Sequence, residues 1–242
     1  MSDFLTGDAM PLLPAADLPP AGSAPDPGVL LVAWLRKAEE RAVREALAAT
    51  LATATPDGIP SSRTVRLAEL TADGAVFGTS SSSRKGRELA ANPRASVTVY
   101  WRELVLQVRL DGPVEVLDAD ASDALCADRP PAARAATVAS RQDDALDDFD
   151  SLHRRADELL AEGVPIARPA DWWGYRVVPS TIEFWQGSPD RLHRRLRYER
   201  DTAGHWSVRG LSPDQGIPAS LPKLSQMYSS FELDGLTVSP PG

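Results

Sequence analysis

The sequence predicts an α+β protein built on a mainly antiparallel, barrel-like β-sheet with peripheral helices. Between residues 48 and 117, short apolar or alternating runs are separated by Pro-Asp-Gly at 56–58 and Asp-Gly at 73–74, a pattern typical of hairpins. Strand-like runs resume after Pro169 and continue to about Val208, beyond a helical stretch. Together these runs indicate a β-barrel-like sheet dressed with helices, which is an α+β protein.

Residues 1–25 are rich in Pro, Ala, Gly and Asp and show no sustained period, so we expect a flexible arm. Asp26 is a candidate N-cap, and Pro27 follows it at a position where proline suits the start of a helix. Apolar residues then recur at helical spacing, namely Leu30, Leu31, Trp34, Leu35 and Ala38. The sequence therefore predicts an amphipathic first helix.

The runs from Ala48 to Leu117 are interpreted as a β-meander with one helical interruption. The interruption is Ser82 to Pro93, which has a serine at its start, good helix formers within it and a terminating Asn-Pro. Further helices are expected between Asp118 and Gly163, with a break at the two prolines 130–131 and a second helix around residues 149–160.

The acidic run DDALDDFD at residues 143–150 is interpreted as a solvated helix start that complements the helix dipole. Residues 212–242 contain several prolines and little periodicity, which predicts an irregular tail. The expected organisation is an arm over residues 1–25, one domain over residues 26–211 and this tail.

Composition excludes several classes of function. A net charge of −8 and a pI near 5.0 argue against a general nucleic-acid or anionic-membrane surface. No apolar run approaches the length of a membrane span, and the N-terminus lacks the order of a secretory signal, so a cytoplasmic protein is expected. A single Cys126 allows no internal disulfide, and His153, His193 and His205 have no metal-ligand spacing.

A row of cations follows an aromatic turn near the end of the predicted domain. If residues 191–199 are extended, one face carries Arg191, His193, Arg195 and Arg197. Like charges at this spacing repel, so the row suits either a bound anion or a solvated edge strand. Trp185 and Gln186 precede the row and offer a π surface and an amide, while Gln107 can contact the edge of a heterocycle or face water.

A second group of cations suggests a phosphate site. Alternation places Arg63 on the same strand face as Val65 and Leu67, where an arginine needs a partner. The next helix opens with hydroxyls and cations beside its free N–H groups, contributed by Ser82, Ser83, Arg84 and Lys85. The alternative is an ordinary capped helix with exposed basic residues.

In chain order these pieces resemble the pyridoxamine 5′-phosphate oxidase family of FMN-dependent enzymes. The resemblance runs from about Asp26 to Leu211. It is based on SRTVRL, SRKGRELAANPRAS, LQVRLDGPVEVL, an RP followed by SRQ, and WWGYRVVPSTIEFWQGSPDRLHRR. The combination of EFWQG with RLH-x-R is specific. The resemblance implies an FMN-binding split β-barrel and a homodimer with FMN at the subunit interface.

The resemblance also assigns site residues. One subunit would hold FMN through Arg63, Thr64, Val65, Arg66, Leu67, Ala68, Gly78, Thr79, Arg84 and Lys85. The site would be closed by Gln107, Gln142, Trp185 and Arg195, some of them from the partner subunit. Arg191 and His193 match the substrate-facing pair that orients an anionic substrate, and Arg129 matches a substrate-binding arginine. No metal is expected.

Departures from the family pattern bear on the substrate. The vitamin B6 oxidases of the family hold the substrate phosphate with a lysine, a tyrosine, an arginine and a serine, and the matching positions here are Ala68, Leu125, Arg129 and Ala133. Each lost contact costs about 1–3 kcal/mol of binding. Short segments are similar instead to the phenazine-biosynthesis branch, namely FLTG at residues 4–7, YWRE at 100–103 and LHRRLRYERD at 192–201.

The primary expectation is therefore an FMN-dependent oxidase of secondary metabolism that aromatises a reduced, carboxylated heterocycle, with O2 as the final acceptor and H2O2 as the product. Two alternatives remain open. One is a pyridoxine/pyridoxamine 5′-phosphate oxidase with a remodelled phosphate pocket, and the other is a flavin-binding split-barrel protein without oxidase turnover.

Overall fold

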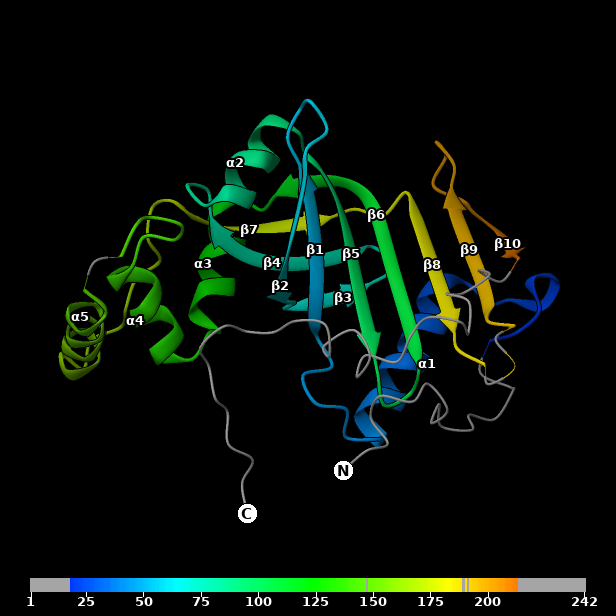
Figure 1. The fold of residues 1–242 in the computed structure, drawn as a ribbon, viewed down its shortest axis with the longest axis horizontal. Helices are drawn as coiled ribbons and strands as arrows, with labels where there is room; N and C mark the ends of the chain where they lie inside the picture. Colours follow the sequence, from blue (N-terminus) through cyan, green and yellow to red (C-terminus); the bar gives the residue numbers. More distant parts are fainter. Residues whose placement is uncertain (1–17, 147, 189, 191, 213–242) are drawn as a thin grey trace, which may run out of the picture.

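The structure is a computed structural model that describes residues 18–146, 148–188, 190 and 192–212. Within these residues a curled antiparallel sheet is flanked by helices, as Figure 1 shows. The helices are η1 (Ala21–Ser23), α1 (Pro27–Glu40), α2 (Arg84–Ala91), α3 (Ala119–Ala127), α4 (Pro131–Ala139) and α5 (Phe149–Ala161). The strands are β1 (Ala48–Ala54), β2 (Pro60–Arg66), β3 (Glu69–Thr71), β4 (Gly74–Ser80), β5 (Arg94–Trp101), β6 (Leu106–Val116), β7 (Trp172–Val177), β8 (Thr181–Gln186), β9 (Arg194–Arg200) and β10 (Trp206–Leu211).

The strand order along the main path is β10-β9-β8-β6-β5-β1-β2. β6 is long enough to serve two partners, since its first half pairs with β8 and its last residues pair with β7. β7 also pairs with β4, and β4 with β3, so the sheet turns back on itself. The predicted meander is wrong in this respect, because β1 pairs with β5 and the β3–β4 hairpin joins β7.

Helix α1 begins and packs as the sequence predicts. The side chain of Asp26 accepts a hydrogen bond from the amide of Gly28 at 2.8 Å, which caps the helix. The buried face of the helix packs on the core side of the sheet, where Trp34 contacts Phe184 edge-on at 5.1 Å between ring centroids. Trp34 also meets Trp101 edge-on, so α1 closes the hydrophobic core.

The segment before α1 belongs to the packed structure. Leu18 is only 1% exposed and lies in the core. The hydroxyl of Tyr198 donates to the Pro25 carbonyl at 2.8 Å, and burial raises the pKa of this phenol to about 12. Packing thus starts ahead of the expected boundary at Asp26. Residues 1–17 and 213–242, which make up most of the expected arm and tail, lie outside the described residues.

The helical region contains α3, α4 and α5, one helix more than the two segments expected from sequence. The break at residues 130–131 is present, but its second proline starts α4 rather than a loop. The acidic run divides: Asp148 caps α5 by accepting from the Ser151 amide, whereas Asp143 contacts α2. No helix in the described ranges has the length and apolar character needed to cross a membrane.

Candidate active site

In the loop between β4 and α2, backbone groups of the loop lie very close to the first turn of the helix. The hydroxyl of Ser83 caps α2 by accepting from the Gly86 amide at 3.2 Å, and it donates to the Ser80 carbonyl at 2.7 Å. A Cβ at Gly86 would lie 2.5 Å from that carbonyl oxygen, so glycine is required there. The predicted serine cap is confirmed.

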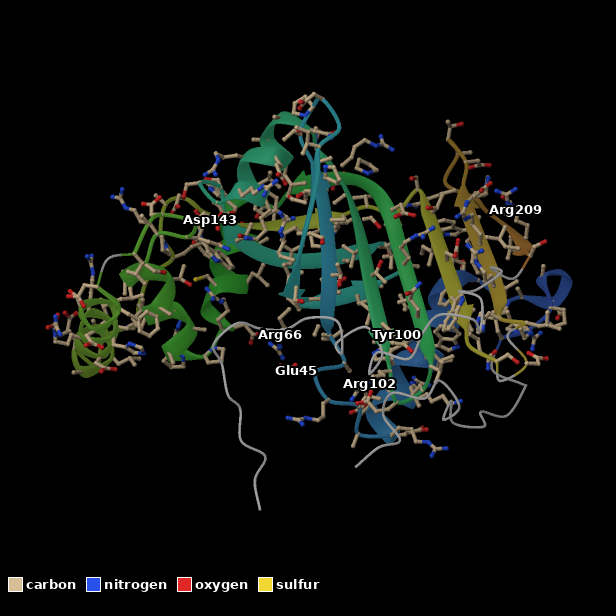
Figure 2. All side chains as sticks on the ribbon, viewed as in Figure 1. Glu45, Arg66, Tyr100, Arg102, Asp143 and Arg209 are labelled. Carbon is tan, nitrogen blue, oxygen red and sulfur yellow. The ribbon has the colours of Figure 1, made fainter. Side chains whose placement is uncertain are left out.

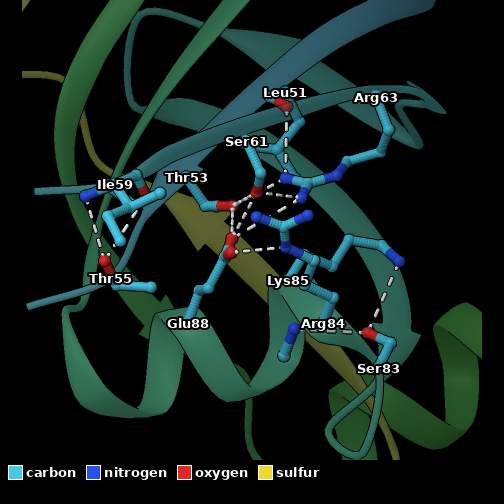
Figure 3. A network of polar contacts seen from close by, with 12 residues as sticks. Leu51, Thr53, Thr55, Ile59, Ser61, Arg63, Ser83, Arg84, Lys85 and Glu88 are labelled. Atoms are coloured by element: carbon cyan, nitrogen blue, oxygen red, sulfur yellow. Dashed lines mark hydrogen bonds and ion pairs between the residues drawn. The ribbon is translucent and has the colours of Figure 1, made fainter. Parts of the chain in front are cut away.

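The partners of Arg63 lie on β1, β2 and α2. Its guanidinium donates to the Thr53 hydroxyl at 2.6 Å and to the Ser61 hydroxyl at 2.5 Å, and it lies 3.5 Å from the Glu88 carboxylate (Figure 3). Glu88 also accepts from both hydroxyls and from the side chain of Arg84 at 2.9 Å. The required partner of Arg63 is therefore a glutamate one helical turn after Arg84, which the sequence reasoning did not identify.

Glu88 is ionised over a wide pH range. Its burial by itself raises the pKa of the carboxyl. Hydrogen bonds from Ser61, Thr53 and Arg84, together with the charge of Arg84, outweigh this effect and lower the pKa from 4.5 to about 2. The carboxylate thus holds Arg63 and Arg84 in fixed orientations near the N-terminus of α2.

Lys85 lies in the same place and is 5% exposed. Its ammonium group donates to the Ser83 hydroxyl at 3.4 Å. Burial lowers the pKa of Lys85; the charge of Arg63 acts in the same direction and that of Asp143 opposes it. Beside it, the Thr79 hydroxyl donates to the Gln142 side chain at 3.3 Å. Five predicted cofactor residues therefore converge here: Arg63, Thr79, Arg84, Lys85 and Gln142.

Gly78 and Arg129 are linked through one tryptophan. A Cβ at Gly78 would lie 2.0 Å from the Trp172 ring, so the ring packs directly on this glycine. The guanidinium of Arg129 sits 5.2 Å from the centre of the Trp172 ring and donates to the Thr137 hydroxyl at 2.8 Å. Arg129 is thus fixed next to the strand that carries Gly78 and Thr79.

The run from Arg63 to Ala68 is divided between the two faces of β2 and its extension. Thr64, Arg66 and Ala68 are exposed, whereas Val65 is half-buried and Leu67 is buried. The amides of Leu67 and Ala68 donate to carbonyl oxygens within the chain, at 2.8 Å each. The side chain of Arg63 therefore lies on the core side of the sheet, next to α2. The side chains of Thr64 and Arg66 point to the opposite side, which is called the outer face.

Three predicted residues, Gln107, Trp185 and Arg195, lie on that outer face beside Tyr100, which was not predicted as a site residue. Tyr100, Gln107, Trp185 and Arg195 are direct neighbours across β5, β6, β8 and β9. Together with Arg109 and Glu183 they line a pocket of about 330 Å³. An indole, an amide and a guanidinium side by side suit a planar ring with polar edges.

Glu183 is the anchor of this group. Its side chain is 4% exposed and accepts hydrogen bonds from Arg195 at 2.8 Å and from Arg197 at 2.8 Å, and from Arg109 at 3.3 Å. Burial raises the pKa of Glu183, but the three arginines lower it by a larger amount. The cationic row thus has its counter-ion, Glu183, within the protein. The alternative that this row is a solvated edge strand is wrong, because β9 lies between β8 and β10.

His193 lies at the rim of the outer face. Its ring is 4.8 Å from the Trp185 ring between centroids, and its Nδ1 accepts from the Ser188 amide at 3.1 Å. It also lines a pocket of about 240 Å³ formed with residues 18–21. Arg191, its expected companion, lies outside the described residues.

The two groups are separate within one chain. β1 and β5 lie between β2 and β6, and Arg63 and Gln107 project from opposite faces of the sheet. In Figure 2 the labels of Asp143, near α2, and of Tyr100, at the end of β5 beside the outer pocket, lie well apart. The first group suits a phosphate and the second a planar ring, so the residues fit the expected FMN when two copies each contribute one group.

Two family models match successive parts of the chain. The family model "Pyridoxamine 5′-phosphate oxidase" matches residues 35–162. A second model, "Pyridoxine 5′-phosphate oxidase C-terminal dimerisation region", matches residues 172–213, which carry Trp185, His193 and Arg195.

Relatives of two kinds are similar to the chain to the same degree. A pyridoxine/pyridoxamine 5′-phosphate oxidase from Gluconobacter oxydans is 43% identical over 82% of this chain and all of its own length. A dihydrophenazinedicarboxylate synthase from Burkholderia lata is 44% identical over 87% of this chain and 97% of its own length.

Solved structures confirm the predicted split-barrel fold. PhzG from Burkholderia lata, crystallised with tetrahydrophenazine-1-carboxylic acid, matches with a TM-score of 0.76 and 43% identity over 86% of this chain and all of its own. An FMN-binding protein from Nostoc punctiforme shares the fold at a TM-score of 0.63 and 19% identity, over 78% of this chain and all of its own.

Proposed function

Because the chain belongs to the pyridoxamine 5′-phosphate oxidase family, we propose that it is an FMN-dependent oxidase whose cofactor is bound between two copies of the chain. The separation of the two groups of site residues supports this arrangement, since they project from opposite faces of the sheet of one protomer. The match of residues 172–213 to a dimerisation region supports it independently.

In this proposal each half-site has a distinct task. The group at α2 holds the phosphate: Arg63, Arg84 and Lys85 supply charge, and Thr79 and Gln142 supply polar contacts. Gln107, Trp185 and Arg195 of the second protomer contact the flavin ring. Gly78 and the segment of Thr64, Val65, Arg66, Leu67 and Ala68 are assigned to the same half-site as the α2 group. When bound, FMN supplies the redox chemistry, taking a hydride from the substrate and passing two electrons to O2 to give H2O2.

We propose a reduced, carboxylated heterocycle of the dihydrophenazine type, from secondary metabolism, as the substrate. The observation that carries this proposal is the position of Arg129 over the Trp172 ring between α3 and α4, with Leu125 one helical turn before it on α3 and Ala133 four residues after it on α4. Neither side chain can donate a hydrogen bond to a phosphate ester, nor can that of Ala68. One arginine beside apolar side chains suits a carboxylate on a flat ring better than a phosphate dianion.

The chain's own residues orient the substrate. Arg129, Arg191 and His193 are assigned to the substrate carboxylate. Because Nδ1 of His193 accepts the Ser188 amide, the neutral ring carries its proton on Nε2 and can donate a hydrogen bond from there. We therefore assign His193 a positioning role in which it holds a proton at Nε2. The Trp185 ring beside it limits access of water to this side.

A second candidate is a pyridoxine/pyridoxamine 5′-phosphate oxidase. It is favoured by the relatives that carry this name at the same identity as the phenazine enzyme. In that case Arg66, which is exposed on the outer face, replaces the missing phosphate contacts.

The visible spectrum of the FMN-loaded protein distinguishes the candidates. We expect anaerobic addition of a reduced phenazine carboxylate to bleach the flavin band and pyridoxine 5′-phosphate to leave it unchanged. Bleaching by the phosphate ester would establish the vitamin B6 activity instead. A protein that takes up no FMN, or a stable monomer with full FMN occupancy, would contradict the shared site. Turnover that survives H193A with R191A would remove the roles given to that pair.

A further inference from the structure

Asp143 stands out because its carboxylate lies inside the cradle assigned to an anion. It accepts a hydrogen bond from the backbone amide of Arg84, the first residue of α2, at 2.5 Å. The residue sits in the loop between α4 and α5, directly after Gln142, and Figure 2 shows it beside α2. Its φ of +71° lies in the left-handed region, which aspartate and asparagine tolerate better than most residues.

One cation of the cradle interacts with this carboxylate. Lys85, the next residue of α2, is buried and interacts electrostatically with Asp143. The side chain of Arg84 is held by Glu88, so the Arg84 amide is what this residue offers to the loop. The Asp143 carboxylate accepts the hydrogen bond that this amide can donate.

A phosphate and the Asp143 carboxylate therefore compete for one donor. A helix N-terminus and nearby cations favour a negative charge, and a carboxylate already supplies one. A phosphate that enters the cradle must displace Asp143 or remain close to a like charge, and both outcomes reduce its affinity.

We propose that Asp143 sets the cofactor affinity of this protein by acting as a built-in competitor for the phosphate of FMN. The inference rests on the proposed function, because it places that phosphate at α2. Substitutions in a binding site usually weaken binding, whereas here removal of one side chain is expected to strengthen it.

The test is a titration of the full-length apoprotein with FMN, followed by the quenching of flavin fluorescence. We expect D143N to bind FMN about ten-fold more tightly than the wild type, which is the order of one charge-assisted hydrogen bond. Asparagine suits the positive φ, so the loop keeps its conformation. D143G, which also suits this φ and leaves the Arg84 amide open, should show at least the same gain.

D144N is the matched control. Asp144 follows Asp143 in the loop and is exposed as Asp143 is, but the Arg84 amide donates to Asp143, so D144N removes the same charge from the same loop and leaves that hydrogen bond in place. We expect less than a three-fold change in FMN affinity from this variant, since a solvated charge beyond hydrogen-bonding reach is screened. Riboflavin, which lacks the phosphate, is the matched ligand. Its affinity should be the same for D143N and the wild type.

The inference is overturned if D143N and D143G bind FMN no more tightly than D144N, or if riboflavin gains as much as FMN. Normal FMN binding by the wild type without a gain in the variants overturns this inference alone. Failure of the wild type and all variants to bind either flavin overturns the proposed function together with it.

Discussion

Glu88 and Glu183 each hold arginines that we assign to the cofactor, but they do so in different surroundings. The helix cluster consists of Thr53, Ser61, Arg63, Arg84 and Glu88, and two hydroxyls share the carboxylate with the arginines. The sheet cluster consists of Arg109, Glu183, Arg195 and Arg197, and arginines alone donate to its carboxylate. Both clusters contain more arginines than carboxylates, so each keeps positive charge for an anionic or electron-rich ligand.

The two clusters differ in which acceptors remain for their arginines if the carboxylate is removed. In the helix cluster, Thr53 and Ser61 can still accept from Arg63. In the sheet cluster, three guanidinium groups would remain close together with Asp111 as the nearest counter-ion, paired to Arg109 at 3.1 Å. The sheet cluster is therefore the more fragile of the two, because its arginines depend on one group.

The largest effect is expected for E183Q. Glutamine keeps the shape but removes the charge, so Arg195 and Arg197 lose their counter-ion in a buried position. We expect a loss of about 3–5 kcal/mol in the free energy of unfolding. Urea denaturation measures it, with E199Q as the control, because Glu199 pairs with Arg209 at an exposed site. Equal losses in the two variants would contradict the anchoring role of Glu183.

A smaller effect is expected for E88Q, and it should depend on pH. The folded-state pKa of Glu88 is about 2, below its ordinary 4.5, so its contribution is complete above pH 4.5 and is lost as the pH falls toward 2. The wild type should lose more stability across that window than E88Q. At pH 7 the variant should be about 1–3 kcal/mol less stable. Denaturation midpoints at several pH values test this, and parallel curves for the two proteins would contradict it.

The sequence reveals the helix cluster more readily than the sheet cluster, and the reason is physical. Helix starts are local, so the caps at Asp26 and Ser83 and the cations after Ser83 could be predicted from short segments. Glu88 lies on the same helix, and its spacing of four residues from Arg84 was an available signal that was not used.

The sheet cluster depends on strand register, which is not local. Glu183 faces Arg197 of the next strand on one side and Arg109 on the other, and Arg109 lies on a strand far away in the sequence. The cationic row itself was visible, but the identity of its counter-ion required the pairing of β8 with β6 and β9. The same limit explains the meander, because β1 with β5 and β4 with β7 are pairings that turn signals cannot specify.

The smallest effect is expected for R209Q, and it shows where the sheet cluster ends. Arg209 is the cross-strand neighbour of Arg197, but its own partner is Glu199 at 2.7 Å, and both side chains are exposed. An exposed pair of this kind contributes about 0–1 kcal/mol, since water and salt screen it. R209Q should therefore lower the free energy of unfolding by less than about 1 kcal/mol, and this loss should shrink at high salt. A loss of several kcal/mol that depends on protein concentration would instead extend the cluster to β10 and place that edge of the sheet in the dimer interface.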